Sequence, residues 1–328
     1  MRLSPALDLF CGLGGWTAGA ARTGGRIEVR AALDHNARAI EHYSTAHAGV
    51  AHFCQDAAEF NFAALRDLVG GGYLLASPSC RDFSSAGRPA AKGVGGNGTV
   101  DLASLSTRRT QERNTMWAAV CAVEALEPHT TLFENVTQVY DWPLFPAWRL
   151  AMEALGYTVR EHTLNAADYG GATDRKRAFI TLRRGSALDL APTWGGPSRC
   201  VADCLDDDDS TVNKWREVDG CVTRTRELIR TRQDRAGLRR GILNNVGDGV
   251  RLRCTSDLAP TLTTKSGSQL MLVDGDRVRI LNPMELARIS GWTDGEVSLP
   301  TNRDHASVLI GNAIPMELAH GVCAQAVT

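Results

Sequence analysis

The chain of 328 residues lacks long apolar runs, an apolar core near its start and a dense set of cysteines. No apolar run approaches the roughly 18–20 residues that a membrane-spanning helix needs. The first residues lack the apolar core of a secretory signal peptide, because Asp8 soon interrupts it. Nine cysteines in a chain of this length do not suggest a disulfide scaffold. These absences predict an intracellular, cytoplasmic protein with no membrane partner.

A strong net charge is also lacking. The formal net charge of −1 gives, by itself, no sign of nucleic-acid binding. The distribution is uneven, however, because residues 212–253 hold eleven lysines and arginines against five acidic residues, just after the acidic run Asp206–Asp209. A solvated helix face could give such a cluster. A surface that binds backbone phosphates explains it better, since clustered cations are typical of nucleic-acid binding.

Strand and helix patterns alternate over the first 185 residues. Short strands are expected at residues 6–10, 27–33, 73–75, 130–133, 159–164 and 178–182, with another ending at 55–56. Helices are expected at residues 17–22, 37–46, 114–126 and 144–155. This alternation is typical of a Rossmann-like α/β sheet. The composition then shifts toward Arg, Thr and Gly, with β-like runs at 261–264 and 270–273 and helical patterns at 283–289 and after 315.

A glycine-rich turn, CGLGGW at residues 11–16, follows the first expected strand. Glycines let the backbone come close to a ligand, and such a turn fits nicotinamide, flavin or S-adenosylmethionine, or a purely structural bend. The second strand ends in Asp34, about 20 residues after the turn, which is the spacing of an acid that accepts hydrogen bonds from a ribose. The turn and this acid form a candidate cofactor site.

Cys80 follows the apolar strand at 73–75, and small residues and Arg81 flank it. In an open α/β sheet the carboxyl end of a strand is where ligands bind, and a cation beside a cysteine favours the thiolate. Glu134 follows another strand and is expected at the same edge. Alone, each residue could be structural: a buried cysteine and a helix-start acid. Together they indicate a catalytic pair, with the Gly-rich stretch 84–100 as a mobile loop beside it.

Five motifs occur in order along the chain: DLFCGLGGW (8–16), SPSC (77–80), ENV (134–136), RKR (175–177) and GNAIP (311–315). Together they resemble the DNA (cytosine-5)-methyltransferase family, which uses S-adenosylmethionine. The resemblance covers nearly the whole chain and leaves about 190–255 unmatched, where the family houses target recognition. It implies an α/β fold, with a Rossmann-like S-adenosylmethionine-dependent methyltransferase sheet and a smaller, mostly β or irregular target-recognition domain.

The resemblance also implies a division into domains and a set of site residues. Residues 1–188, completed by 305–328, would form the catalytic, cofactor-binding domain, and 189–304 the target-recognition domain. Cys80 is similar to the family's nucleophile and Glu134 to its acid. Arg175 and Arg177 resemble the pair that orients the cysteine loop, the glutamate and the base.

The cofactor site that the resemblance implies draws on every part of the catalytic domain. Asp34 resembles the acid that holds the ribose, with His35 packed beside it. Asp56 resembles the contact to the adenine amine, and Asn312 would close the pocket. The full set is Phe10, Gly12, Gly14, Gly15, Asp34, His35, Asp56, Ala57, Ser77, Pro78, Met116, Asn312 and Ala313. No metal is expected.

Four positions depart from the family's usual pattern. Pro78-Ser79-Cys80-Arg81 stands where Pro-Pro-Cys-Gln is frequent, Thr173 stands where a glutamine precedes the arginine pair, and Ala172 replaces the proline before it. These residues lie beside the central groups of the chemistry. They bear on loop geometry and rate more than on reaction type.

The implied activity is that of a DNA (cytosine-5-)-methyltransferase of the EC 2.1.1.37 type. A methyl group would pass from S-adenosylmethionine to carbon-5 of a flipped-out cytosine in a short duplex DNA site, through a covalent Cys80 adduct, leaving S-adenosylhomocysteine. We expect a monomer that binds double-stranded DNA. It would belong to a restriction-modification system, act as an orphan enzyme or come from a phage. Its expected location is the bacterial cytoplasm or nucleoid, or a phage-infected host.

Other interpretations stay open. One branch of the same family methylates tRNA cytosine, and a catalytically silent DNA-binding relative would keep the fold. A dinucleotide-dependent oxidoreductase explains the glycine turn and Asp34 but leaves Cys80 and Glu134 without a purpose. Cys200 and Cys204 are spaced loosely like zinc ligands, although no second such pair follows.

Overall fold

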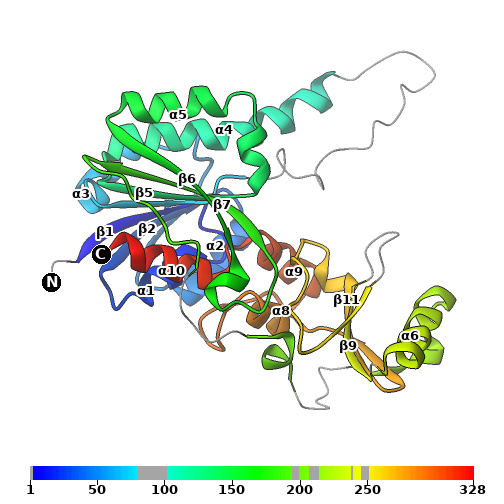
Figure 1. Ribbon diagram of the computed structural model, residues 1–328. Coiled ribbons are helices and arrows are strands. Elements are labelled where there is room, and N and C mark those ends of the chain that lie inside the picture. Colours follow the sequence, from blue (N-terminus) through cyan, green and yellow to red (C-terminus); the bar gives the residue numbers. More distant parts are fainter. Residues whose placement is uncertain (1–2, 80–101, 194–198, 207–213, 238, 245–250) are drawn as a thin grey trace. The chain divides into compact units, whose positions relative to one another are not determined.

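The computed structural model, drawn in Figure 1, describes residues 3–79, 102–193, 199–206, 214–237, 239–244 and 251–328, without the side chains of 102–113, 224, 232, 235 and 236. It divides into two compact units. The first contains Met1–Leu164, Lys176–Pro192 and Ala319–Thr328, and the second contains Asn165–Arg175 and Thr193–Leu318. Residues 305–318, predicted as part of the catalytic domain, fall in the second unit, where α9 (Arg303–Asn312) packs with α7 (Ser266–Gln269) and α8 (Pro283–Ile289). The predicted roles of the domains stay predictions.

The first unit is built on a seven-stranded sheet of order β3-β2-β1-β4-β5-β7-β6. Its strands are β1 (Ser4–Leu9), β2 (Ile27–Asp34), β3 (Ala51–Cys54), β4 (Tyr73–Ala76), β5 (Thr130–Asn135), β6 (Tyr157–Asn165) and β7 (Lys176–Arg184). Strands β1 to β5 pair in parallel, whereas β7 runs antiparallel to β5. The central strands β4 and β5 are buried along their whole length, as expected of parallel strands covered on both faces.

Helices cover both faces of this sheet (Figure 1). They are α1 (Gly15–Ala21), α2 (Ala37–Ala46), α3 (Arg66–Val69), α4 (Leu102–Leu126), α5 (Phe145–Ala154) and α10 (Met316–Ala326). On the α4 and α5 side, Val123 and Trp148 pack with Leu74 and Phe133 of the sheet in the main core. On the other side α1 and α10 approach closely at Gly19, where a Cβ atom would lie 2.6 Å from that of Ala319.

The second unit contains an antiparallel sheet of order β10-β9-β11-β12-β8. Its strands are β8 (Arg216–Glu217), β9 (Arg240–Asn244), β10 (Arg251–Cys254), β11 (Leu270–Asp274) and β12 (Arg277–Ile280), and its helices are α6 (Thr223–Ala236), α7 (Ser266–Gln269), α8 (Pro283–Ile289) and α9. Ile229 of α6 packs on Leu243 and Val273, so α6 covers one face of this sheet. Short 3-10 turns occur at Phe62–Leu65, Thr137–Asp141, Ala166–Tyr169, Val201–Cys204 and Val218–Gly220.

Most predicted elements are present, with some different bounds. The helices at 37–46 and 283–289 are confirmed at both ends. The helix predicted from 114 begins earlier, at Leu102. The prediction missed this start because a polar stretch precedes the apolar pattern of the helix. The strand predicted at 261–264 is wrong. A single bridge joins Thr173 to Ala259, just before these residues, and the Thr263 N–H donates to the Ser266 hydroxyl.

Within the described part of the chain, no helix is long and apolar enough to cross a membrane.

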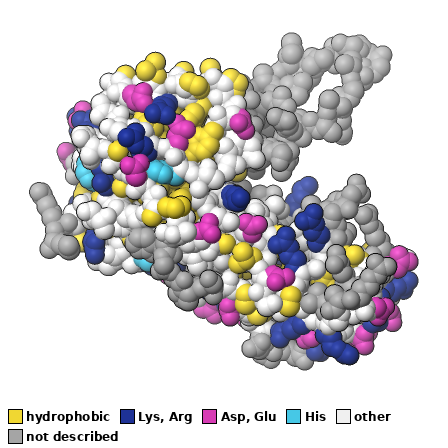
Figure 2. Space-filling model, viewed as in Figure 1, with side chains coloured by type: hydrophobic (Ala, Val, Ile, Leu, Met, Phe, Trp, Pro, Cys, Tyr) yellow, Lys and Arg dark blue, Asp and Glu magenta, His cyan; other side chains and the backbone are white. Residues whose placement is uncertain are grey.

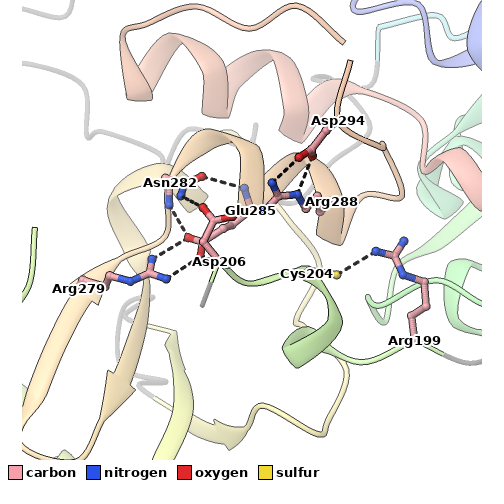
Figure 3. Close-up of polar contacts among 8 residues, drawn as sticks. All are labelled: Arg199, Cys204, Asp206, Arg279, Asn282, Glu285, Arg288 and Asp294. Atoms are coloured by element: carbon pink, nitrogen blue, oxygen red, sulfur yellow. Dashed lines mark hydrogen bonds and ion pairs between the residues drawn. The ribbon is translucent and has the colours of Figure 1, made fainter. Parts of the chain in front are cut away.

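A buried ion pair organises the second unit (Figure 3). Arg279 of β12 donates two hydrogen bonds, of 2.7 and 2.6 Å, to the Glu285 carboxylate, and both side chains are buried. Glu285 also accepts from the backbone N–H of Asn282, whose side chain caps α8 in return. Asp206 joins the network through Asn282 and Arg288. The ion pair and these hydrogen bonds together fasten β12, helix α8 and the segment at Asp206.

We predict that Glu285→Ala lowers the free energy of unfolding by about 3–5 kcal/mol, because it leaves the Arg279 guanidinium buried without its carboxylate. The exposed pair of Arg149 with Glu153 gives the matched control, and Glu153→Ala should cost less than about 1 kcal/mol. Urea unfolding followed by tryptophan fluorescence measures both. Equal losses in the two variants would contradict this account of the second unit.

Candidate active site

The predicted cofactor turn lies directly after β1. Phe10, Gly12 and Gly14 all have positive φ angles, of 62°, 53° and 83°. Phe10 is the unusual member, since a side chain disfavours this left-handed conformation and such strain concentrates at functional sites. At Gly14 the φ of 83° strains any other residue, and a Cβ atom would also lie 2.3 Å from the His47 ring. The turn is thereby held tightly against α2.

Asp34, at the end of β2, is bound to this turn. Its Oδ2 accepts from the Gly12 N–H at 2.9 Å, and its Oδ1 accepts from the Asn36 N–H at 2.8 Å. His35 Nδ1 lies 3.5 Å from Oδ1. Each carboxylate oxygen retains acceptor capacity, so the oriented acid remains able to accept from ribose hydroxyls. The structure therefore brings the glycine turn and the predicted ribose acid together.

Asp56 and Ala57 lie in the turn after β3, and β3 ends beside Asp34 through the register pair of Asp34 with Cys54. Asp56 is exposed, and its Oδ1 accepts from the Ala58 N–H. Ala57 is buried in the main core. Their predicted contacts with the adenine stay predictions. An oriented carboxylate and backbone glycines lie at these strand ends, and these groups fit a nucleoside-containing cofactor.

Asp8 is a residue of this site that the sequence analysis missed. It is 0% exposed, and its Oδ2 accepts from the backbone N–H of Thr17 and, at 2.7 Å, from the Thr17 hydroxyl. The Thr17 hydroxyl lies 2.7 Å from that of Tyr43. Burial raises the pKa of Asp8 to about 7. An aspartate inside an otherwise apolar strand was the available sign of this network.

The segment Ser77–Ser79 continues from β4 at the same edge of the sheet. Ser77 N–H donates to the Leu9 carbonyl at 3.2 Å, and its hydroxyl accepts from Trp16 Nε1 at 3.0 Å. Asn135 Nδ2 donates to the Pro78 carbonyl at 3.1 Å. The predicted nucleophile Cys80, its neighbour Arg81 and the predicted loop 84–100 lie outside the described residues.

Glu134 and Arg177 form an ion pair at this edge. Arg177 Nε lies 3.0 Å from Glu134 Oε1, and both side chains are largely buried. The pair exists because β7 is antiparallel to β5, with Phe179 opposite Glu134, so the first residues of β7 lie beside the last residues of β5. Two of the predicted catalytic residues are therefore in direct contact.

Arg175 belongs to the second unit and makes a different set of contacts. Its buried guanidinium donates to the carbonyls of Leu262, Gly311 and Ala313, at 3.2, 2.9 and 2.8 Å. Charged donors to carbonyls are strong hydrogen bonds. These contacts hold the GNAIP segment in place, and the predicted role of Arg175 toward the cysteine loop and the base stays a prediction. Thr173 fastens the preceding chain by donating to the Pro260 carbonyl.

Three further predicted cofactor residues lie in packed surroundings or in the second unit. Met116 is buried in the main core, and its carbonyl accepts from Trp148 Nε1. Asn312 ends α9 and is exposed, and Ala313 follows as its C-cap. Their parts in a cofactor site stay predictions.

The thiol of Cys204 contacts the backbone of Cys200. Cys204 Sγ donates to the Cys200 carbonyl and lies 3.4 Å from an Arg199 nitrogen (Figure 3). Burial raises the pKa of Cys204 to about 11, so this thiol is neutral in the metal-free protein. Among the residues that the structure describes, no group of three or more His, Cys, Asp or Glu side chains could hold a metal ion.

The sheet order, the antiparallel β7 and the glycine turn at the first crossover define the class of the first unit. It is a Rossmann-like S-adenosylmethionine-dependent methyltransferase fold.

The model of the C-5 cytosine-specific DNA methylase family matches residues 5–327, and the chain belongs to this family. Two relatives are Type II methyltransferases of Herpetosiphon aurantiacus. M.HgiBI is 29% identical over 182 residues, which are 53% of this chain and 36% of that relative. M.HgiDI is 29% identical over 188 residues, which are 56% of this chain and 54% of that relative. The matched segments thus span about a third to a half of these relatives.

Solved structures share the fold over almost the entire chain. A protein assigned as a DNA modification methyltransferase and encoded within an Escherichia coli prophage has a TM-score of 0.70 at 20% identity, with 99% of this chain and 98% of that chain covered. The Dnmt2 methyltransferase of S. pombe has a TM-score of 0.66 at 15% identity, with 98% of each chain covered. At these identities the likeness concerns the fold alone.

The buried Asp8 gives a pH prediction. Its pKa in the folded protein lies above that of an unfolded aspartate, so the folded state binds the proton more tightly. The contribution of Asp8 to stability is therefore greatest at low pH, falls as the pH rises from about 4 to about 7, and stays low above that range. Asp8→Asn removes this dependence, and at pH 8 the variant should unfold at the same or a higher temperature than the parent. Thermal unfolding from pH 4 to 8 checks this, and a parallel pH dependence in both proteins would contradict it.

Proposed function

We propose that this protein is a DNA (cytosine-5-)-methyltransferase that acts on cytosine in a short duplex DNA site. The observation that carries the proposal is the Glu134–Arg177 ion pair, at the sheet edge from which Ser77–Ser79 leads to Cys80. The family of the chain and its Type II methyltransferase relatives support the same reaction. A monomer in the bacterial cytoplasm or nucleoid is part of this proposal.

The proposed chemistry begins at Cys80. Carbon-5 of cytosine is a poor nucleophile, and addition of a thiolate to carbon-6 makes it enamine-like. Cysteine suits this step because it is strongly nucleophilic and can later leave. S-adenosylmethionine, when bound, supplies the electrophilic methyl group. Loss of the carbon-5 proton to a base then restores the ring and expels the Cys80 thiolate.

Glu134 and Arg177 would activate the base. Addition at carbon-6 places electrons on ring nitrogen 3, and a proton shared between that nitrogen and the Glu134 carboxyl stabilises them. Arg177 uses Nε to hold Glu134, and one of its terminal nitrogens donates to the Lys176 carbonyl. Its planar fork leaves further donors for the ring carbonyl of the base. The proposed cofactor contacts are those of Gly12 and Asp34, which are already oriented toward each other.

The proposed DNA interface lies in the second unit. A stacked base cannot be reached from both ring faces, so the target must be extruded at a cost of a few kcal/mol, which phosphate contacts have to offset. Lys and Arg side chains gather over the region of β9, β11 and α6 (Figure 2). Arg251 and Arg253 of β10 pair opposite Asn244 and Ile242 of β9, so they project from the same face of the hairpin as Arg240. The proposed phosphate contacts on this face are the exposed Arg240 and Arg251 side chains, because Ile242 between them is buried and Arg253 donates to the Leu258 carbonyl.

Some arginines of the second unit already form ion pairs within the protein, and others are exposed and could bind a DNA phosphate. Arg230 of α6 is paired with Asp219 and Asp276, whereas Arg251 is exposed on its strand. We predict that Arg251→Ala weakens DNA binding and lowers the slope of log affinity against log salt by about 1, as for the loss of one phosphate contact. Arg230→Ala is the control and should change the slope less. Fluorescence anisotropy between about 50 and 200 mM salt measures both. A flat salt response of the parent protein would contradict the proposed interface.

The catalytic assignment predicts a graded loss of methyl transfer. Cys80→Ala should abolish transfer to DNA while S-adenosylmethionine binding persists. Glu134→Gln should lower the rate by about 10²–10⁴-fold, the usual contribution of a general acid. Lys176→Ala, an exposed neighbour of the ion pair, should keep the parent rate within a factor of about three. Transfer of a tritiated methyl group to duplex DNA and to tRNA measures these rates.

Near-normal turnover of Cys80→Ala would refute the nucleophile. Transfer to tRNA but not to DNA would keep the chemistry and replace the substrate.

A further inference from the structure

The segment that leads to Cys80 is held by three hydrogen bonds over two residues. Over Ser77 and Pro78, one hydrogen bond comes from each of three separate elements: the Leu9 carbonyl of β1, the Trp16 indole of α1 and the Asn135 amide of β5. The contact with Leu9 joins two backbone groups, and the contact with Asn135 involves the ENV motif. The third, from Trp16, is between two side chains, and the catalytic scheme gives Trp16 no role.

Trp16 is fixed firmly enough to act as an anchor. Its side chain is 1% exposed, and its ring packs edge-to-face on Phe179, with 6.1 Å between ring centroids. Phe179 is the strand partner of Glu134. A buried indole N–H needs an acceptor, and leaving it without one is costly, so the Trp16–Ser77 bond fixes the position of the Ser77 hydroxyl as well as that of the ring.

The sequence supplies a reason for this anchor. Ser79 occupies a position where the resemblance leads one to expect a second proline before the cysteine. Proline fixes φ and lowers the number of conformations open to the chain, and serine does neither. A segment with one proline instead of two needs other constraints to hold one conformation, and hydrogen bonds from a rigid neighbour provide them.

We propose that Trp16 is a positioning residue: through Ser77 it couples the helix that follows the cofactor turn to the segment that carries the nucleophile. Trp16 lies two residues after Gly14, so the same short stretch shapes the turn and holds the Ser77–Ser79 segment. The effect on catalysis rests on the proposed function, while the effect on the segment does not.

The test compares Trp16→Phe, which removes the N–H and keeps a ring, with Ser77→Ala, which removes the acceptor. Ser77→Thr keeps a hydroxyl as acceptor and should speed exchange at 77 and 79 less than Ser77→Ala does. Tyr157→Phe is the matched control, because the Tyr157 hydroxyl also donates one buried hydrogen bond, to the Pro128 carbonyl, away from this edge. Amide hydrogen exchange of residues 77 and 79 is measured by mass spectrometry, together with kcat, the KM for S-adenosylmethionine and the temperature of unfolding.

Trp16→Phe and Ser77→Ala should each speed exchange of these amides about tenfold, because the constraint on the segment is one hydrogen bond. Each should lower kcat about five- to tenfold, and Trp16→Phe should change the KM for S-adenosylmethionine less than threefold. The double variant should be no worse than the weaker single one, since both remove the same bond. Tyr157→Phe should lower the unfolding temperature and leave exchange at 77 and 79 and kcat unchanged.

Unchanged exchange in both Trp16→Phe and Ser77→Ala would overturn the proposal, as would additive losses in the double variant. Faster exchange with unchanged kcat would show a contact that holds the segment without serving catalysis, which also overturns it. If the parent protein transfers no methyl group to DNA or tRNA, the proposed function falls, and the exchange data still decide whether Trp16 holds the segment.

Discussion

The antiparallel pairing of β7 with β5 is the constraint on which the site depends. In a sheet of parallel strands, side chains at the carboxyl ends meet at one edge, and the start of every strand lies at the other. Because β7 runs the opposite way, its second residue, Arg177, arrives at the carboxyl end of β5 and pairs with Glu134. A parallel β7 would carry this arginine to the far edge. The reversal of one strand thus creates the ion pair.

The other strand ends at this edge are joined by hydrogen bonds that cross from one connection to the next. Asp34 at the end of β2 holds Gly12 after β1, and Ser77 after β4 is bound to Leu9 and Trp16. Glycines and strained backbone at the turn would be mobile by themselves, so these bonds keep the cofactor side and the nucleophile side of the edge in one arrangement. In the second unit the Arg279–Glu285 pair has the corresponding role for the sheet and α8.

Much of this arrangement is readable from the sequence, because strands and motifs are local. The helix at 37–46 begins at an Asn36 cap, and the one at 283–289 begins with Asn282 and Glu285 in a capping box, so the start of each was predictable. Apolar periodicity gave no start for α4, because the polar run at 106–114 separates its first residues from its apolar second half. The Asp8–Thr17–Tyr43 network and the partners of Arg175 depend on residues distant in the chain, and nothing local identifies such partners.

The most direct measurement of the central claim is the trapping of a covalent complex. In duplex DNA with 5-fluorocytosine at the target position, fluorine replaces the carbon-5 hydrogen and cannot leave as a cation. The cysteine is then not expelled, so an active enzyme stays attached to the DNA when S-adenosylmethionine is present. Proteolysis and mass spectrometry then locate the attachment. The account predicts a cross-link on Cys80 alone. A cross-link on an exposed cysteine such as Cys54 or Cys121, or no cross-link in a preparation that methylates DNA, would contradict it.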